Sequence, residues 1–267
     1  MKLKSKLLLA LLATSSAAFA QTAPAAPEVT YNVGVVSQYR YRGLAQGKGQ
    51  PALQGGVDYA NANGYYAGAW ASTINWIKDT STTATPGYSG STELDLYGGY
   101  KFESSGVAYD VGFLRYQYTG NNLSKAPGSG DPQLNNANTN EVYAAGTLGA
   151  YTFKWSYALS NLFGAQNSKG SDYFDLSANY DMGSGITLTP HLGRAIVTGG
   201  GNVPSGGVTA GSLSYTDASL TVAKDLGNGL SATAAAIVTN AKSSSFNSGS
   251  LYATGKSAVV LGLKYGF

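Results

Sequence analysis

The feature that most constrains this chain is the alternation of apolar and polar residues along it. The clearest stretch, 151–159, is apolar or aromatic at every second position, and 29–35 and 174–182 follow the same rule. A period of two sends successive side chains to opposite faces of a β-strand, so each strand has one apolar and one polar face. A soluble β-sandwich gives the same alternation, so other features must decide between the two folds.

Helical membrane spans are excluded by the length of the apolar runs. Beyond residue 20 the longest run is five residues, Ala234 to Val238, whereas a membrane helix needs about 20. Charged residues make up 12% of the chain, about half the usual share in soluble domains. The absence of cysteine excludes a disulfide scaffold and a cysteine-ligated metal site.

The connections favour a membrane barrel. Short turns are predicted at 61–64, 103–106, 149–150, 183–185 and 227–229, and longer polar loops at 43–50, 78–90, 120–138, 161–170, 199–212 and 240–255. Five turns alternating with six loops require twelve strands, with both chain ends on the turn side. Bacterial outer-membrane barrels have an even strand number, short periplasmic turns and long external loops. We therefore predict an all-β protein, a single antiparallel transmembrane β-barrel of about 12 strands over 29–267, in the cell outer membrane.

The first residues predict export. Three lysines within the first six residues precede an apolar segment, 7–13, and Ala-Phe-Ala at 18–20 fits a cleavage site. We assign 1–20 to a signal peptide and 21–28 to a leader segment. Cleavage removes three lysines and lowers the formal net charge from +3 to zero. No basic surface then remains to indicate a nucleic-acid partner.

The last strand carries a possible assembly signal. Apolar residues occupy every second position from 259 to 267 and end in Tyr265 and Phe267. This pattern is similar to the C-terminal signal of outer-membrane barrels. We expect Tyr265 and Phe267 to engage the barrel-assembly machinery, and the apolar outer face to contact outer-membrane lipid.

The polar face of the strands is expected to line the lumen. Charges this frequent on a membrane strand need water or partners, so this face forms either a hydrated conduit or a closed salt-bridge network. Arg115 joins it only if a β-bulge shifts the phase between Phe113 and Leu114. We place Arg40 and Arg42 on the first strand, near the outer mouth, opposite two acidic residues in a constriction. The predicted pore-lining residues are Arg40, Arg42, Asp58, Glu93, Asp95, Lys101, Asp110, Arg115, Glu141, Lys154, Asp175 and His191.

Aromatic residues near predicted strand ends are interpreted as interface anchors. On the turn side these are Tyr31, Tyr59, Phe102, Tyr109, Tyr151 and Tyr265, and on the loop side Trp76, Tyr116, Tyr118 and Tyr157. Two residues of the ninth strand depart from the pattern. Pro190 removes a ladder donor, and Arg194 falls on the apolar phase, so either the register shifts there or Arg194 lies at the outer interface.

Four segments resemble a known family. VSQYRYRG at 36–43, PALQGGVDY at 51–59, GYYAGAWAS at 64–72 and ELDLYGGY at 93–100 are similar to the opening segments of the TorF-type porin family of proteobacterial outer membranes. The resemblance covers the first third of the mature chain well and the final strand loosely. It implies an outer-membrane barrel of the porin class and no particular solute.

The sequence favours a channel for passive diffusion of small hydrophilic solutes. One alternative is a non-conducting barrel whose Gly-, Ser-, Thr- and Asn-rich external loops bind a partner or a surface. Another is an outer-membrane lipid hydrolase using His191, the only histidine, but no serine motif supplies its partner. We expect no enzyme activity, and no motif indicates a cofactor or a metal.

Overall fold

The computed structural model describes residues 27–47, 49–80, 87, 89–122, 136–199, 213–242 and 256–267. The predicted signal peptide and most of the leader lie outside these residues. The strands are β1 (Glu28–Val36), β2 (Arg40–Tyr41), β3 (Leu44–Ala45), β4 (Ala52–Ala60), β5 (Tyr65–Thr73), β6 (Thr92–Ser104), β7 (Val107–Thr119), β8 (Thr139–Leu148), β9 (Tyr151–Ala158), β10 (Asp172–Ala178), β11 (Tyr180–Asp181), β12 (Ile186–Ile196), β13 (Tyr215–Gly227), β14 (Leu230–Thr239) and β15 (Ala258–Gly266). The described residues contain a single 3-10 turn, η1 (Lys78–Thr80). No helix in this part of the chain is long and apolar enough to cross a membrane.

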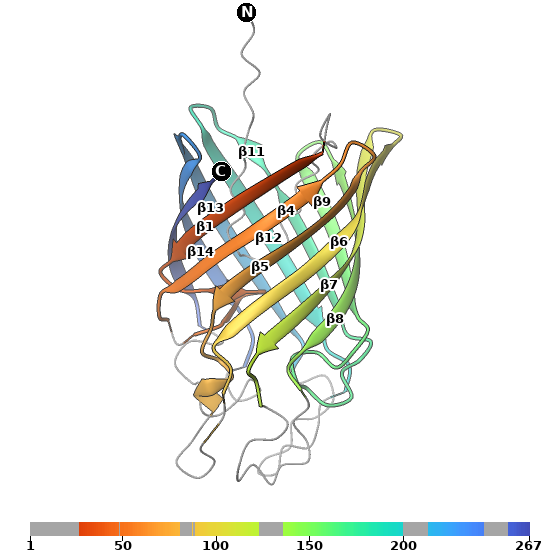
Figure 1. Ribbon diagram of the computed structural model, residues 1–267, viewed down its shortest axis with the longest axis vertical. Helices are drawn as coiled ribbons and strands as arrows, with labels where there is room; N and C mark the ends of the chain where they lie inside the picture. The colour runs from red at the N-terminus through yellow and green to blue at the C-terminus, as the bar shows by residue number, and fades with distance from the viewer. Residues whose placement is uncertain are drawn as a thin grey trace, which may run out of the picture.

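The sheet closes into a barrel, as predicted. Its neighbours follow chain order from β4 to β10, β12 returns to pair with β10, and β15 pairs with β1. β10 and β11 both pair with β12 in one register and form a single membrane strand, so the barrel has twelve strands. All pairs are antiparallel, and closure leaves no edge of unpaired backbone groups in lipid. The start of β1, the end of β15 and the short turns lie at one end, and the strand ends from which the long connections leave lie at the other (Figure 1).

The outer face is apolar. Val29, Leu176 and Leu220 expose 50%, 49% and 48% of their surface. Aromatic rings stack in pairs near the turn-side rim, among them Tyr31 on Phe267 and Phe102 on Tyr109. An apolar wall with an aromatic girdle around a closed barrel is the lipid-facing surface of an outer-membrane protein. The chain is an outer-membrane β-barrel.

Phe267 also takes part in closing the barrel. Its backbone exchanges hydrogen bonds with Tyr31 of β1, at N–O distances of 2.8 and 3.0 Å. Its ring stacks on Tyr31 and on Tyr265, with centroids 5.7 and 5.6 Å apart. The end of β15 is therefore fixed to β1 by both backbone and side-chain contacts.

The predicted bulge in β7 does not form, and Arg115 does not face the lumen. β7 pairs with β6 and β8 without a register shift through Phe113 and Leu114. Leu114 instead points inward and packs against a buried apolar cluster. Arg115 therefore faces outward near the loop-side rim, where it donates to the side chains of Gln117 and Asn140. The apolar positions of the sequence therefore switch at Leu114 because this leucine packs inside the lumen, while the strand itself stays regular.

The two irregular positions in β12 have separate explanations. The strand pairs with β13 without a break from Ile186 to Ala195, but its ladder to the other neighbour is interrupted at Asn179, next to the position opposite Pro190. The Thr189 hydroxyl donates to the Asn179 side chain at 2.7 Å across this gap. Arg194 keeps the regular register, points outward near the loop-side end and donates to Thr216. Of the two alternatives, the outer-interface position of Arg194 is confirmed.

The prediction for the loop-side aromatics is wrong for three of them, Trp76, Tyr116 and Tyr118. Tyr116 and Tyr118 are 1% and 2% exposed inside the barrel, on the same face as Leu114. Trp76 packs edge-on against Tyr118, and Tyr157 stays near Trp155 on the outer wall. A tyrosine has an apolar ring and a polar hydroxyl, so it suits both the membrane interface and a polar lumen.

Candidate functional site: the lumen and its inserted hairpin

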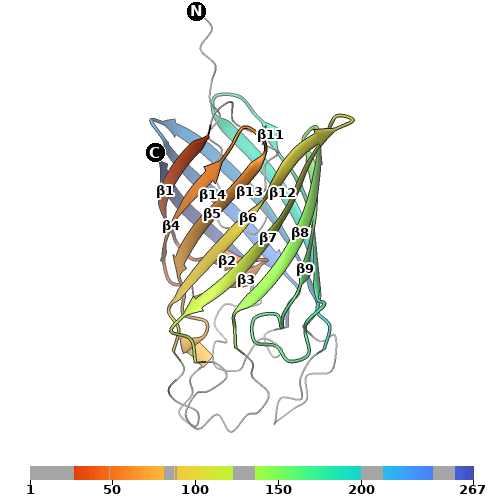
Figure 2. The same ribbon diagram turned by 45° about the vertical axis from the view of Figure 1, so that its right-hand side comes forward.

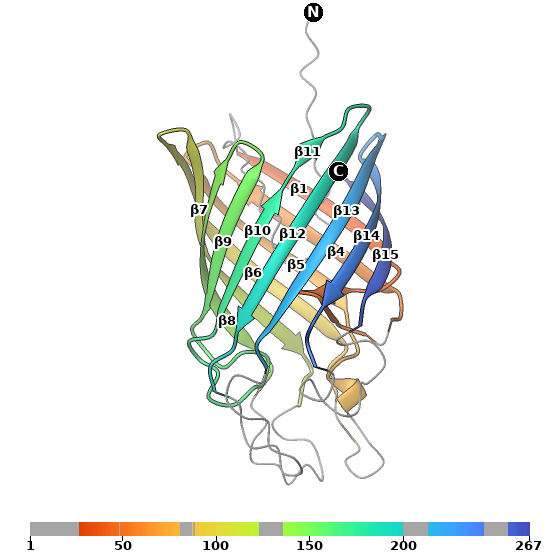
Figure 3. The same ribbon diagram turned by 180° about the vertical axis from the view of Figure 1, so that it is seen from behind.

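The first long connection folds into the barrel. After Val36 the chain leaves the wall and forms the two-residue strands β2 and β3, which lie within the barrel outline toward its loop-side end (Figures 2 and 3). We call residues 37–47 the lumen hairpin. Arg42 and Gly43 at its tip have positive φ angles of 46° and 76°. A Cβ on Gly43 would lie 2.5 Å from the Cβ of Asp217 on β13, so the tip reaches the far wall.

Arg40 and Arg42 therefore belong to this hairpin and not to the first membrane strand. Arg42 donates from both Nη atoms to the two carboxylate oxygens of Glu141 on β8, at 2.8 Å each. Its guanidinium lies 4.3 Å from the ring centroid of Tyr173 on β10. Arg42 and Glu141 are 6% and 2% exposed. Burial disfavours the charged guanidinium, but Glu141 together with Tyr41 and Tyr116 raises the pKa of Arg42.

Arg40 stabilises the hairpin itself. Its Nη1 donates to the carbonyls of Gly43 and Lys256 at 3.1 and 2.7 Å, and its Nε donates to the Gln38 side chain at 3.0 Å. All these partners are neutral acceptors. The side chain thus holds the turn together and ties it to the segment before β15.

The predicted constriction of Arg40 and Arg42 against Glu93 and Asp95 does not form. Both acids do face the lumen from β6, but Glu93 accepts a hydrogen bond from Tyr39 of the hairpin at 2.6 Å. In the described residues neither acid forms an ion pair with an arginine. The partner of Arg42 comes from another strand because Arg42 lies on the hairpin beyond the end of β1, and the tip of this hairpin reaches β8 and β13.

Tyrosine hydroxyls are the usual partners of the lumen carboxylates. Tyr97 donates to Asp58, Tyr66 donates to Asp110 at 2.5 Å, Tyr116 to Glu141 at 3.0 Å, and Tyr173 to Asp217 at 3.0 Å. A tyrosine satisfies the hydrogen bonding of a carboxylate without cancelling its negative charge. The lumen acids are therefore hydrogen-bonded mainly by neutral hydroxyls, and of these four Glu141 also pairs with an arginine, Arg42.

Glycines on neighbouring strands make room for these tyrosines. A Cβ on Gly68 would lie 2.5 Å from the ring of Tyr97, which crosses it to reach Asp58. Tyr66 and Tyr143 hydrogen-bond to each other over Gly99 and Gly112, where an added Cβ would also lie 2.5 Å from a tyrosine oxygen. The tyrosine rings therefore lie flat along the wall, over glycines of neighbouring strands.

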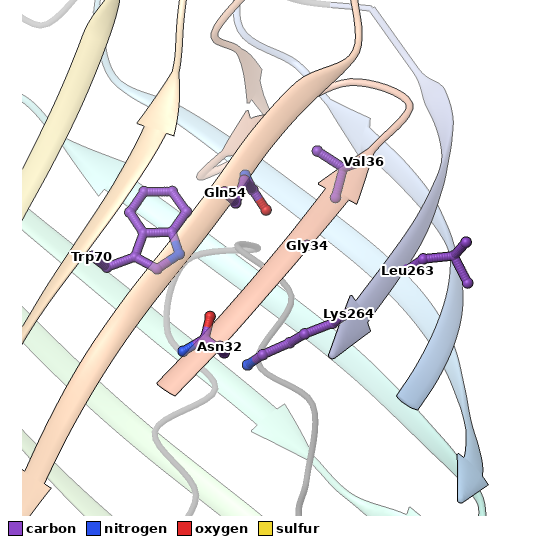
Figure 4. Close-up of a pocket in the computed structure, with 7 residues that line it drawn as sticks. All are labelled: Asn32, Gly34, Val36, Gln54, Trp70, Leu263 and Lys264. Atoms are coloured by element: carbon purple, nitrogen blue, oxygen red, sulfur yellow. The ribbon is translucent and has the colours of Figure 1, made fainter. Parts of the chain in front are cut away.

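The basic residues of the wall lie at mid-height and toward the turn side. The Nζ of Lys101 is 5.0 Å from the ring centroid of Tyr66, and that of Lys154 is 4.0 Å from Tyr143. Lys264 and Asn32 border a small pocket in the wall together with Trp70 and Gln54 (Figure 4). Rings under the ammonium groups hold Lys101 and Lys154 against the wall by cation–π attraction.

Charge is consequently distributed unevenly along the lumen. Among the described residues of the loop-side half, the acids Glu93, Asp95, Glu141, Asp175 and Asp217 stand against Arg40, Arg42 and His191. In the remainder, Asp58 and Asp110 stand against Lys101, Lys154 and Lys264. The loop-side half is thus the more negative end.

The loop-side half is also the more tightly filled. Tyr39 of the lumen hairpin joins an apolar cluster with Ile74, Ile77, Tyr116 and Tyr118, all 3% exposed or less. In the turn-side half, Asp58, Lys101 and Tyr66 keep intermediate exposure. The lumen hairpin and its cluster thus fill the loop-side half, whereas several polar side chains of the turn-side half stay half-exposed.

His191 lies in an ionic cluster on the wall. Its Nε2 is 2.7 Å from Asp175, and its Nδ1 is 3.7 Å from Asp217. Ser177 is its partner across the ladder, yet within the described structure the Ser177 hydroxyl has no hydrogen bond. Both ring nitrogens face carboxylates, so this arrangement does not activate a serine as a hydrolase requires.

Sequence comparison places the chain in a family. A family model described as "Bacterial protein of unknown function (Gcw_chp)" matches residues 20–267. The chain belongs to the Gcw_chp family. A sequence comparison with curated proteins finds no match. The description of the Gcw_chp family states no activity.

Solved structures share the barrel fold at low sequence identity. The NanC porin matches with a TM-score of 0.51 and 9% identity, covering 89% of this chain and 99% of the porin. The KdgM porin matches with a TM-score of 0.48 and 8% identity, over 90% and 98% of the two chains. An outer membrane channel from Pseudomonas putida F1 gives 0.48 and 15%, over 91% and 95%. The NanC match supports the barrel fold.

Most of the predicted lumen residues do face inward, and one important residue was missed. Asp58, Glu93, Asp95, Lys101, Asp110, Glu141, Lys154, Asp175 and His191 all lie on the inner face of the wall. Asp217, which contacts His191, Tyr173 and the tip of the lumen hairpin, was not predicted. The sequence pattern that identifies Asp217 as inward-facing is the alternation along β13. Its polar positions are Asp217, Ser219 and Thr221, and its apolar positions are Ala218, Leu220 and Val222.

Proposed function

We propose that this Gcw_chp protein is a porin-like channel for passive diffusion of small hydrophilic solutes across the outer membrane. The observation that carries the proposal is the inner wall, which presents charged and polar side chains from the turn-side end of the barrel to the lumen hairpin. Charged groups on the inside of a membrane barrel are stable only when water or partners reach them. The resemblance to TorF-type porins supports the same function.

The lumen hairpin limits what such a channel passes. It crosses the loop-side half and is fixed to the wall through Arg42 and Tyr39, so the free cross-section there is small. Solutes must therefore be small or must displace the hairpin. With acids in excess at this end, small cations are favoured over anions of the same size.

A second candidate function is a non-conducting barrel whose external loops bind a partner. The observation that favours it is the apolar cluster around Tyr39, which fills the loop-side half and opposes the passage of water. A hydrolase has no comparable support, because His191 is held between two carboxylates.

The test is conductance of the purified full-length barrel in a planar bilayer. A channel gives discrete current steps as single barrels insert. Repeated insertion without steps, with folded barrel verified by its heat-modifiable migration on a gel, would contradict the channel and favour the loop-binding function. Turnover of phospholipid in the same preparation would point to the hydrolase.

A further inference from the structure

The contacts of Arg42 have the composition of a binding site for a guanidinium group. Glu141 receives both Nη atoms at 2.8 Å, which is the bidentate geometry that matches the planar guanidinium. The ring of Tyr173 covers one face of the same group at 4.3 Å. The hydroxyl of Tyr116 donates to Glu141 at 3.0 Å and fixes the carboxylate.

The three barrel residues of this site come from the wall and not from the hairpin. Tyr116, Glu141 and Tyr173 lie on β7, β8 and β10, and each is 2% exposed or less. Strands of a closed barrel hold side chains more rigidly than loops do. The site therefore keeps its shape when the side chain that occupies it is removed.

The occupant, in contrast, lies on a short hairpin whose other contacts to the barrel include those of Tyr39 and Arg40. Arg42 is at the tip of a hairpin whose strands are two residues long and form two paired positions. A group on a short flexible linker acts at an effective concentration in the millimolar range, and the further contacts of this hairpin raise that concentration. A free solute with the same group therefore competes with Arg42 only at millimolar concentrations or above, and binds more readily once Arg42 is removed.

We propose that Tyr116, Glu141 and Tyr173 form a lumen site for small solutes that carry a guanidinium group, and that Arg42 occupies it as a tethered ligand. The site thus defines a class of solutes for the channel proposed above. Its physiological role rests on that proposed function. Displacement of Arg42 releases the tip of the lumen hairpin from the wall. Binding of the solute thereby also widens the passage.

Ligand binding is tested by thermal unfolding of the full-length barrel in detergent, which does not depend on conduction. Arg42→Ala empties the site, and Arg42→Gln is a second emptying variant that fills more of the same space. L-arginine is the probe, and L-citrulline is the neutral control of the same shape. We expect arginine to raise the midpoint temperature of both variants in a saturable way, and citrulline to leave it unchanged.

Two further variants serve as controls. Arg40→Ala removes hairpin contacts but leaves Arg42 in place, so it should respond to arginine as weakly as the wild type does. Adding Glu141→Gln to Arg42→Ala removes the charged acceptor and should weaken arginine binding about tenfold or more, because hydrogen bonds to a charged group contribute about 1.5–3 kcal/mol.

Three results would overturn the site. They are an equal shift of the midpoint temperature with arginine and citrulline, a shift that survives Glu141→Gln, and the absence of a shift in both emptied variants. The bilayer experiment separates this result from the channel itself. A conducting barrel without an arginine response contradicts only the site. An arginine response in a barrel that never conducts contradicts only the channel.

Discussion

At the residue scale, the side of the wall to which a side chain points decides the cost of a charge. Leu220 faces lipid in the middle of β13 and is 48% exposed, whereas its neighbour Thr221 faces the lumen. Leu220→Arg should lower barrel stability by about 2–4 kcal/mol, the cost of a charge near the bilayer midplane. Thr221→Arg should cost much less. Denaturant unfolding in lipid measures both, and equal losses would show that the two faces are wrongly assigned.

The tyrosine–glycine contacts make a second residue-scale prediction. Gly68→Ala places a methyl group 2.5 Å from the ring of Tyr97 and should destabilise the barrel by about 1–3 kcal/mol. Most of this loss should disappear in a Tyr97→Ser background, because the clash has one partner. Gly146→Ala is the control, since its nearest neighbour would be 3.6 Å away. Additive losses in the double variant would contradict the contact.

At the element scale, the strands were predictable from the sequence and the lumen hairpin was not. Strand faces and turns follow from local rules, a period of two and turn residues, and these hold along the barrel. The hairpin is fixed by contacts between residues distant in the chain, such as Arg42 and Glu141, which are 99 positions apart. The inward position of Leu114 and Tyr116 was also hidden, because an apolar residue in a lumen looks like one facing lipid.

The hairpin tip gives the prediction at this scale. Gly43 and Gly49 both have positive φ, at 76° and 72°, but only Gly43 lies against the wall, at Asp217. Gly43→Val should push the tip away from β13 and increase single-channel conductance while the barrel stays folded. Gly49→Val carries the same backbone strain with no atom within 4 Å, so conductance should remain at the wild-type level. An increase in both variants would attribute the effect to strain alone.

At the scale of the whole molecule, three properties combine: an apolar outer wall, a polar lumen and a hairpin inserted from the loop side. The first was predictable because lipid imposes it on every strand. The second was predictable in outline, although Asp217 and the tyrosine partners of the acids were not. The third changes the expected behaviour most, because it narrows an otherwise wide barrel at one end.

The central claim, that this barrel conducts and that the lumen hairpin restricts it, is tested most directly by removing the hairpin. Val36 and Ala52 are paired across β1 and β4, so a two-residue Asn-Gly turn can replace residues 37–51 without disturbing the ladder. Single-channel conductance of this variant is compared with that of the full-length barrel in the same bilayer. The account predicts small steps for the full-length barrel and severalfold larger steps for the variant. A folded, inserted variant that passes no current, or steps of equal size in both proteins, would contradict it.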